Sequence, residues 1–162
     1  MAKEKLSATS PADAQELVAQ VETGAREPVG LAGKILIGTA LAWSLFQLWY
    51  ASPLPFVFNV GVFNSTEARS LHLAFALFLA FTAFPAFHHS PRDRVPIQDW
   101  VYALLGAFCA AYLFLFYREL SDRPGAPILQ DVIVACAGIL LLLEATRRAL
   151  GPPLAIIASI LL

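Results

Sequence analysis

Four long apolar runs constrain this chain more than any other feature of its sequence. They cover residues 31–51, 68–87, 100–117 and 128–145. A helix needs about 20 predominantly apolar residues to cross a bilayer, so each run is close to that length. Over the whole chain 58% of 162 residues are hydrophobic and only 14% are charged, which is too little polar surface for a soluble domain of this size. We therefore predict an all-α polytopic membrane protein with four transmembrane helices.

The two ends of the chain differ from this central part, residues 31–150, which we interpret as a four-helix membrane module. Residues 1–30 are polar and lack the apolar core of a signal peptide. We expect them to be a cytosolic lead-in with one short surface helix over about 11–21. At the other end, Gly151, Pro152 and Pro153 predict a hinge. The apolar residues 154–162 are too few to cross a bilayer, and we expect them to begin a further apolar segment.

The distribution of Lys and Arg predicts the orientation, because these residues accumulate in cytoplasmic loops. If the N-terminus lies inside the cell, the cytoplasmic segments contain more Lys and Arg residues than the external segments. The cytoplasmic segments would hold Arg26, Lys34, Arg92, Arg94, Arg147 and Arg148, against Arg69, Arg118 and Arg123 outside. We therefore expect a multi-pass protein of the bacterial inner (cytoplasmic) membrane, with both termini in the cytoplasm.

Local signals predict where several helices begin. Asn64, followed three residues later by Glu67, is typical of a capping box at the start of the second span. Asp99 is the expected N-cap of the third span. Asp131 lies near the start of the fourth span, where its charge suits the helix dipole.

Small residues predict where helices approach one another closely. The predicted seams are Ala76, Ala80 and Ala83 on the second span, and Ala103, Gly106 and Ala110 on the third. Residues 52–66 form a predicted loop with many large apolar side chains. We expect this loop to lie among lipid headgroups or against another protein.

Two groups of charged residues are candidate contacts with partners. Glu144, Arg147 and Arg148 follow the i, i+3, i+4 spacing that lets opposite charges pair on one helix face. They fit either a stop signal at the cytosolic interface or a fixed electrostatic contact with a neighbouring helix or domain. The other group lies at the external end of the second span.

That second group is Glu67, Arg69 and His72. It fits either a helix cap with interface charges or a contact for a soluble periplasmic partner. For the first group, Glu144, Arg147 and Arg148, we expect no role as a proton or sodium site, because it lies at the membrane edge and not at the midplane.

No motif in the chain predicts catalysis, a metal site, a cofactor or a substrate-binding site. No carboxylate lies at the middle of a span, where ion pathways place them. Cys109 and Cys136 lie inside apolar runs and are expected to be inert thiols, and His88 and His89 to be solvated loop residues. The net charge of −1 gives no indication of nucleic-acid binding. We therefore expect a protein that is not an enzyme.

Four segments resemble the N-terminal part of the fused permeases of TRAP transporters, the tripartite ATP-independent periplasmic transporters. The match is best with the kind paired with TAXI-type binding proteins. It extends from Leu31 to the C-terminus. The segments are residues 43–49 (WSLFQLW), 66–75 (TEARSLHLAF), 90–94 (SPRDR) and 143–153 (LEATRRALGPP).

The resemblance implies a small four-helix scaffold beside a large transport module, which holds the substrate and ion sites. It also implies a separate periplasmic binding protein that delivers an organic acid. No substrate-binding or ion-binding residue carries over, because those residues belong to the large module. Two alternatives stay open: a stand-alone membrane interaction protein with no transport role, and a membrane enzyme using His72, His88, His89 or the cysteines.

Overall fold

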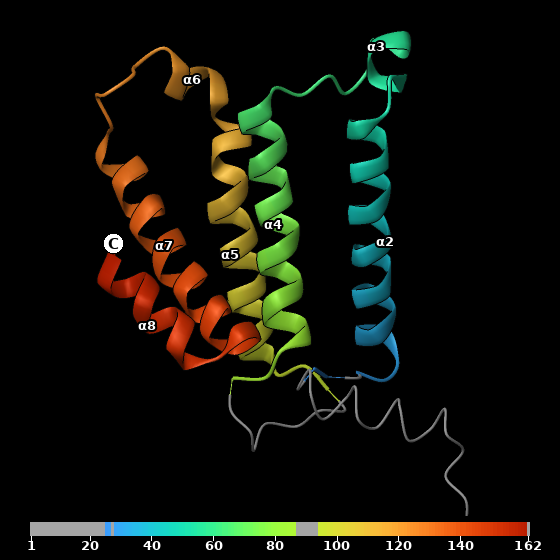
Figure 1. Ribbon diagram of the computed structural model, residues 1–162, viewed down its shortest axis with the longest axis vertical. Coiled ribbons are helices and arrows are strands. Elements are labelled where there is room, and N and C mark those ends of the chain that lie inside the picture. Colours follow the sequence, from blue (N-terminus) through green and yellow to red (C-terminus); the bar gives the residue numbers. More distant parts are fainter. Residues whose placement is uncertain (1–24, 27, 87–93, 162) are drawn as a thin grey trace, which may run out of the picture.

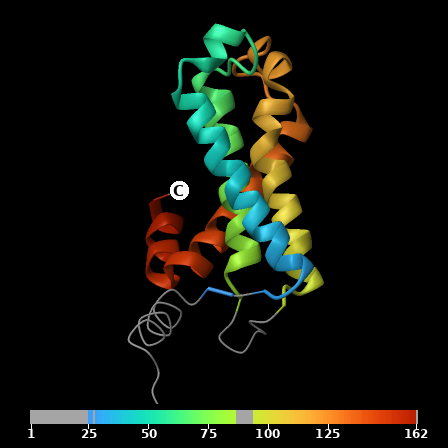
Figure 2. The same cartoon turned by 90° about the vertical axis from the view of Figure 1, so that its right-hand side faces the viewer.

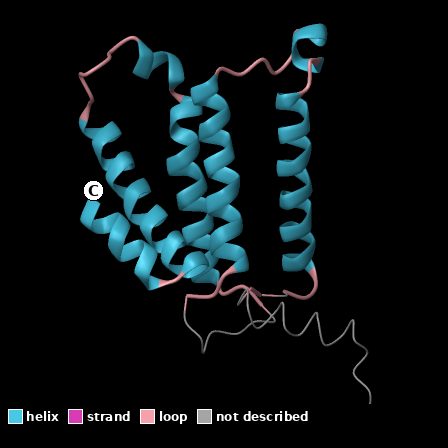
Figure 3. Cartoon of the chain, in the orientation of Figure 1, coloured by secondary structure: helices cyan, strands magenta, loops and turns pink. Residues whose placement is uncertain are grey.

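Every regular element in the described part of the chain is a helix (Figure 3). The computed structural model describes residues 25–26, 28–86 and 94–161. The all-α class is therefore confirmed. The predicted surface helix over 11–21 lies outside the described residues, as do His88 and His89.

Four long helices run along the molecule, and three short ones follow or join them (Figure 1). The long helices are α2 (Leu31–Ala51), α4 (Ser65–Ala83), α5 (Ile97–Leu115) and α7 (Leu129–Leu150). The short helices are α3 (Leu54–Phe58), α6 (Tyr117–Ser121) and α8 (Pro152–Leu161). Helices α4 and α5 lie in the middle, with α2 on one side and α7 and α8 on the other (Figure 1).

Three of the described helices, α2, α5 and α7, are long and apolar enough to cross a membrane. Helix α4 is not among them, so the prediction of four such helices is confirmed for three. The cause is the polar content of its first turns, where Glu67, Arg69, Ser70 and His72 lower its mean hydropathy. A membrane protein is thus supported by three helices, and α4 does not meet the same criterion.

The bundle has two chemically different ends. At one end, the backbone N–H of Arg26 donates to the carbonyl of Ala83 at 2.7 Å, and Asp99 and Arg148 meet beside them. We call this the Arg26 end. It gathers residues 25–26 and 28–30, the end of α4, the start of α5 and the end of α7. The opposite end carries α3 and α6 and is called the α3 end (Figure 1). The orientation of these two ends in a membrane, including a cytoplasmic location of the Arg26 end, stays a prediction.

The tightest packing in the bundle is between α4 and α5. Leu77 and Phe81 of α4 are buried against Ala103 and Ala110 of α5. A Cβ atom built on Gly106 would lie 3.3 Å from the ring of Phe81, so a larger residue has little room there. The small-residue seam predicted for α5 is therefore confirmed.

The seam predicted for α4 is confirmed only at Ala80, which packs against the core. Ala76, Ala80 and Ala83 are only partly buried, because the face that meets α5 is turned to Ala74, Leu77 and Phe81. Large side chains of α4 thus fill the space left by small residues of α5. The hydroxyl of Ser70 adds a buried hydrogen bond of 2.7 Å to the carbonyl of Ala110.

Helix α8 turns back along the end of α7 (Figure 1 and Figure 2). Gly151 ends α7 with φ of 89°, a conformation that favours glycine, and Pro152 begins α8. The helical run thus breaks at this position, and the apolar residues after it form a helix. A hinge here stays a prediction. Within residues 52–66, Phe56, Val57 and Phe58 are exposed as expected, although the short helix α3 was not predicted.

Replacing Gly106 with Leu should lower the free energy of unfolding by about 1–3 kcal/mol, because the new side chain overpacks the contact with Phe81 and Leu77. The matched control is Gly38→Leu in α2, where nothing lies within 4 Å of an added Cβ atom. Denaturation of both variants in detergent micelles measures the difference. Equal stability of the two variants would contradict this packing.

Candidate functional site

A buried carboxylate at the Arg26 end holds two arginines. Asp99 accepts a hydrogen bond of 2.6 Å from Nη2 of Arg26 on one oxygen and one of 2.8 Å from Nη1 of Arg148 on the other. Its side chain is only 5% exposed. The prediction that Asp99 is an N-cap is wrong: α5 begins at Ile97 after Pro96, which leaves Asp99 in the first turn and free to bind the arginines.

The candidate group Glu144, Arg147 and Arg148 pairs as its spacing predicts. Arg147 and Arg148 each donate to the carboxylate of Glu144 at 2.7 Å. Arg148 also reaches Asp99, which makes a fixed contact with the neighbouring helix α5 of the same chain. A contact of this group with a partner stays a prediction. The guanidinium group of Arg148 lies over the ring of Phe81, 4.9 Å from the centroid, in a cation–π arrangement.

Arg26 completes this charge network, which we define as Arg26, Asp99, Glu144, Arg147 and Arg148. The Arg26 side chain is fully buried, at 0% exposure. Two of its guanidinium nitrogens, Nε and Nη1, have no hydrogen-bond partner among the residues that the structure describes. From the sequence, Arg26 was used only to predict the orientation of the chain in the membrane. Its partner Asp99 lies 73 residues further along the chain, so no local pattern indicates the pair.

The charge network is built to hold chain segments together. It joins residues 25–26, α5 and α7, and Arg147 adds a hydrogen bond of 3.2 Å to the carbonyl of Ala86 after α4. Three guanidinium groups face two carboxylates, and both carboxylates are engaged. Carboxylates held in this way are suited to fixing geometry rather than to binding a mobile cation.

The second candidate group, Glu67, Arg69 and His72, separates into three different contacts. Glu67 forms the predicted capping box, with reciprocal hydrogen bonds of 2.9 Å to Asn64. His72 shares a hydrogen bond of 2.8 Å with the side-chain amide of Gln47 on α2. Arg69 is exposed and lines a groove beside α2. The described structure shows no salt bridge among the three.

His72 lies where α2 meets α4. The ring of Trp43 on α2 contacts the His72 ring edge-on, with centroids 5.4 Å apart, and stacks on Phe75 at 6.5 Å. Phe46 of α2 packs on the same two rings. This line of aromatic rings and the bond from Gln47 attach α2 to the rest of the bundle.

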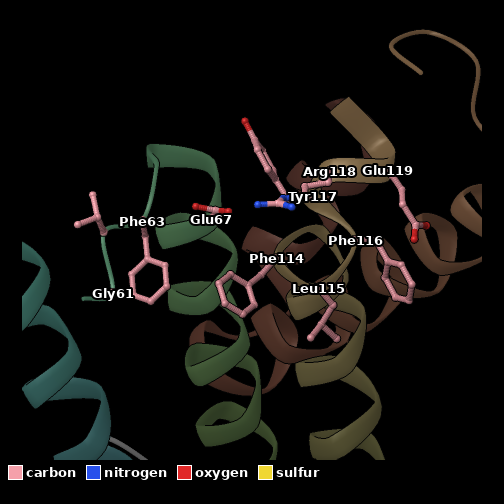
Figure 4. A pocket seen from close by; sticks show the side chains of 10 residues that line it. Gly61, Phe63, Glu67, Phe114, Leu115, Phe116, Tyr117, Arg118 and Glu119 are labelled. Atoms are coloured by element: carbon pink, nitrogen blue, oxygen red, sulfur yellow. The ribbon is translucent and has the colours of Figure 1, made fainter. Parts of the chain in front are cut away.

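A pocket opens at the α3 end between the start of α4 and the α5–α6 junction. Figure 4 shows Phe63 and Phe114 facing one another below the charged groups of Glu67 and Arg118. The two phenylalanine rings make an edge-on contact, with centroids 5.6 Å apart. The pocket therefore has an aromatic floor and a charged mouth.

Asp131 fixes the same end of the molecule. Its carboxylate accepts hydrogen bonds from the hydroxyl of Tyr112 at 2.6 Å, from Arg123 at 3.2 Å and from the backbone of Ile128 at 3.0 Å. Sequence reasoning placed Asp131 correctly in the first turn but missed the partner on α5. The sequence signal that could have indicated this contact was Tyr112, near the end of an apolar run, because a buried tyrosine hydroxyl needs a hydrogen-bond partner.

No group of three His, Cys, Asp or Glu side chains within the described ranges is placed to hold a metal ion. Cys109 and Cys136 are free thiols. No protein-family model, curated protein or solved structure matches the chain. The likeness to TRAP permeases is thus carried by the four sequence segments quoted above.

Replacing Asp99 with Asn should lower the free energy of unfolding by about 3–5 kcal/mol, because Arg26 and Arg148 would stay buried without its charge. Glu119→Gln is the matched control, since Glu119 is exposed and its change should stay within about 0.5 kcal/mol. Chemical denaturation in micelles measures both. An Asp99→Asn protein as stable as the control would refute the bridging role.

The Gln47–His72 bond should couple α2 to α4 by about 0.6 kcal/mol, the average for such interhelical bonds in membranes. A double-mutant cycle with Gln47→Ala and His72→Ala measures this coupling free energy. Strictly additive effects would show that the bond does not contribute.

Proposed function

We propose that the chain is the scaffold membrane module of a TRAP-type secondary transporter that takes up organic acids with a periplasmic binding protein. The single observation that carries this is α2, a 21-residue apolar helix with no buried residue. Such a helix leaves the surface that does not meet α4 available to lipid and to a second membrane protein. The resemblance in sequence identifies that second protein as the large transport module.

The outer helices on the other side of the bundle support the same proposal. Helices α7 and α8 each have one buried residue, Ala145 and Ala155. Many of their large apolar side chains are exposed, including Ile133, Leu140, Ile156, Ile157 and Ile160. Exposed apolar helix faces in a membrane pack on acyl chains or on neighbouring helices.

A scaffold must also keep its shape while the partner moves. The charge network fixes the Arg26 end, and the α4–α5 contact fixes the centre. Interiors packed in this way resist deformation. The small module can then act as a fixed frame against which a larger module changes conformation.

The α3 end offers a surface for the soluble binding protein if it faces the periplasm as predicted. Phe56, Val57 and Phe58 of α3 are exposed, and the pocket with Glu67 and Arg118 lies between α4 and α6 (Figure 4). Aromatic groups beside a charged rim are typical of protein–protein contacts. This end is therefore the proposed docking face.

To test the proposal, the chain is expressed together with a candidate large module and a candidate binding protein from the same genome. We expect a tag on this chain to co-purify the large module in mild detergent. We also expect ion-driven uptake of radiolabelled organic acids to be lost when the coding region for residues 31–150 is deleted. Gln98→Ala is the control variant, since Gln98 is exposed at the start of α5, outside the proposed contact surfaces, and its change should not affect uptake.

Uptake that survives the deletion would contradict the proposal. A chain that purifies without a large module and as a homo-oligomer would instead support the stand-alone interaction protein.

A further inference from the structure

A groove between α2 and α4 has a polar end and an apolar end. Tyr50, Ser65 and Arg69 line it close to the α3 end, and Trp43, Leu73 and Ala76 line it further along the helices. The α4 residues from 65 to 76 span roughly 16 Å at about 1.5 Å per residue. The groove is therefore long enough for part of an acyl chain with a polar group at one end.

The polar end suits an anion. Arg69 is exposed and is the only Arg, Lys, Asp or Glu among the described residues that line the groove. Ser65 and Tyr50 line the same groove, and their hydroxyl groups can donate hydrogen bonds. A guanidinium group binds phosphate oxygens with charge-assisted hydrogen bonds.

The position of this end fits a lipid phosphate. Tyr50 is the second-last residue of α2, and Ser65 is the first residue of α4. Helix α2 is long enough to cross the hydrocarbon layer, so its ends lie near the headgroups, where tyrosine is common. A phosphate beside Arg69 would thus lie at its ordinary depth.

The deeper part suits a hydrocarbon chain. The ring of Trp43 forms one wall, where it stacks on Phe75. Leu73 is exposed, and Ala76 has a small side chain that leaves the space open. Since α2 has no buried residue, a chain in this groove would add apolar contact to the most weakly packed long helix.

We propose that this groove binds one anionic phospholipid, with its phosphate on Arg69 and one acyl chain along Trp43 and Ala76. The lipid bridges α2 and α4 beside the Gln47–His72 bond. This binding site does not depend on a role in transport, so the experiments below test it independently of the proposed function.

The first test measures lipid selectivity. The full chain is equilibrated in micelles with equimolar phosphatidylglycerol and phosphatidylcholine, and native mass spectrometry counts the lipids retained. We expect one phosphatidylglycerol to be retained preferentially, and Arg69→Gln to reduce the preference about fivefold, the contribution of one arginine near an anionic surface. Arg118→Gln is the control, because Arg118 lines the other pocket.

The second test places the acyl chain. A Trp49→Phe, Trp100→Phe variant keeps Trp43 as its only tryptophan. Phosphatidylglycerol brominated on its acyl chains should quench Trp43 fluorescence, and Ala76→Phe, which fills the groove, should abolish most of the quenching. Ala40→Phe is the control, because Ala40 is exposed on α2 and does not line this groove.

Three results would overturn the proposal. The first is equal retention of the two lipids by the wild-type chain. The second is an equal loss of preference in the Arg69 and Arg118 variants. The third is quenching by a brominated free fatty acid but not by the brominated phospholipid, which would assign the groove to a carboxylate ligand instead.

Discussion

The carboxylate of Asp99 between Arg26 and Arg148 is the interaction on which the rest of the structure depends. A buried charge without a partner costs several kcal/mol, so none of these three groups is stable in this place alone. Together they require residues 25–26, the start of α5 and the end of α7 to meet at one point. Arg148 also covers Phe81, which links the charges to the α4–α5 packing.

Away from this end the helices are held by different forces. Helices α4 and α5 pack through Leu77, Phe81 and the small residues of α5, whereas α2 is attached by aromatic rings and by one hydrogen bond to His72. The bundle therefore combines a firmly fixed end and centre with a helix that has no buried residue. A fixed frame with an available outer helix is what the proposed scaffold role needs, and the same feature leaves the groove for a lipid.

The sequence predicted what depends on local patterns. The apolar run at 31–51 coincides with α2, and the capping box of Asn64 and Glu67 forms as expected. It did not predict what depends on distant contacts: Arg26 lies in a polar segment, and nothing local indicates that it is buried against Asp99. The alanine seam predicted for α4 matched the packing only at Ala80, because Ala74, Leu77 and Phe81 form the face that meets α5.

The central claim is that a buried charge network fastens the segment before α2 to the bundle. Site-resolved hydrogen exchange of the Arg26 backbone amide in nanodiscs tests it most directly, since this amide lies outside every helix and bonds to Ala83. The account predicts protection comparable to that of the amides inside α4. Exchange as fast as in an unstructured peptide would contradict it.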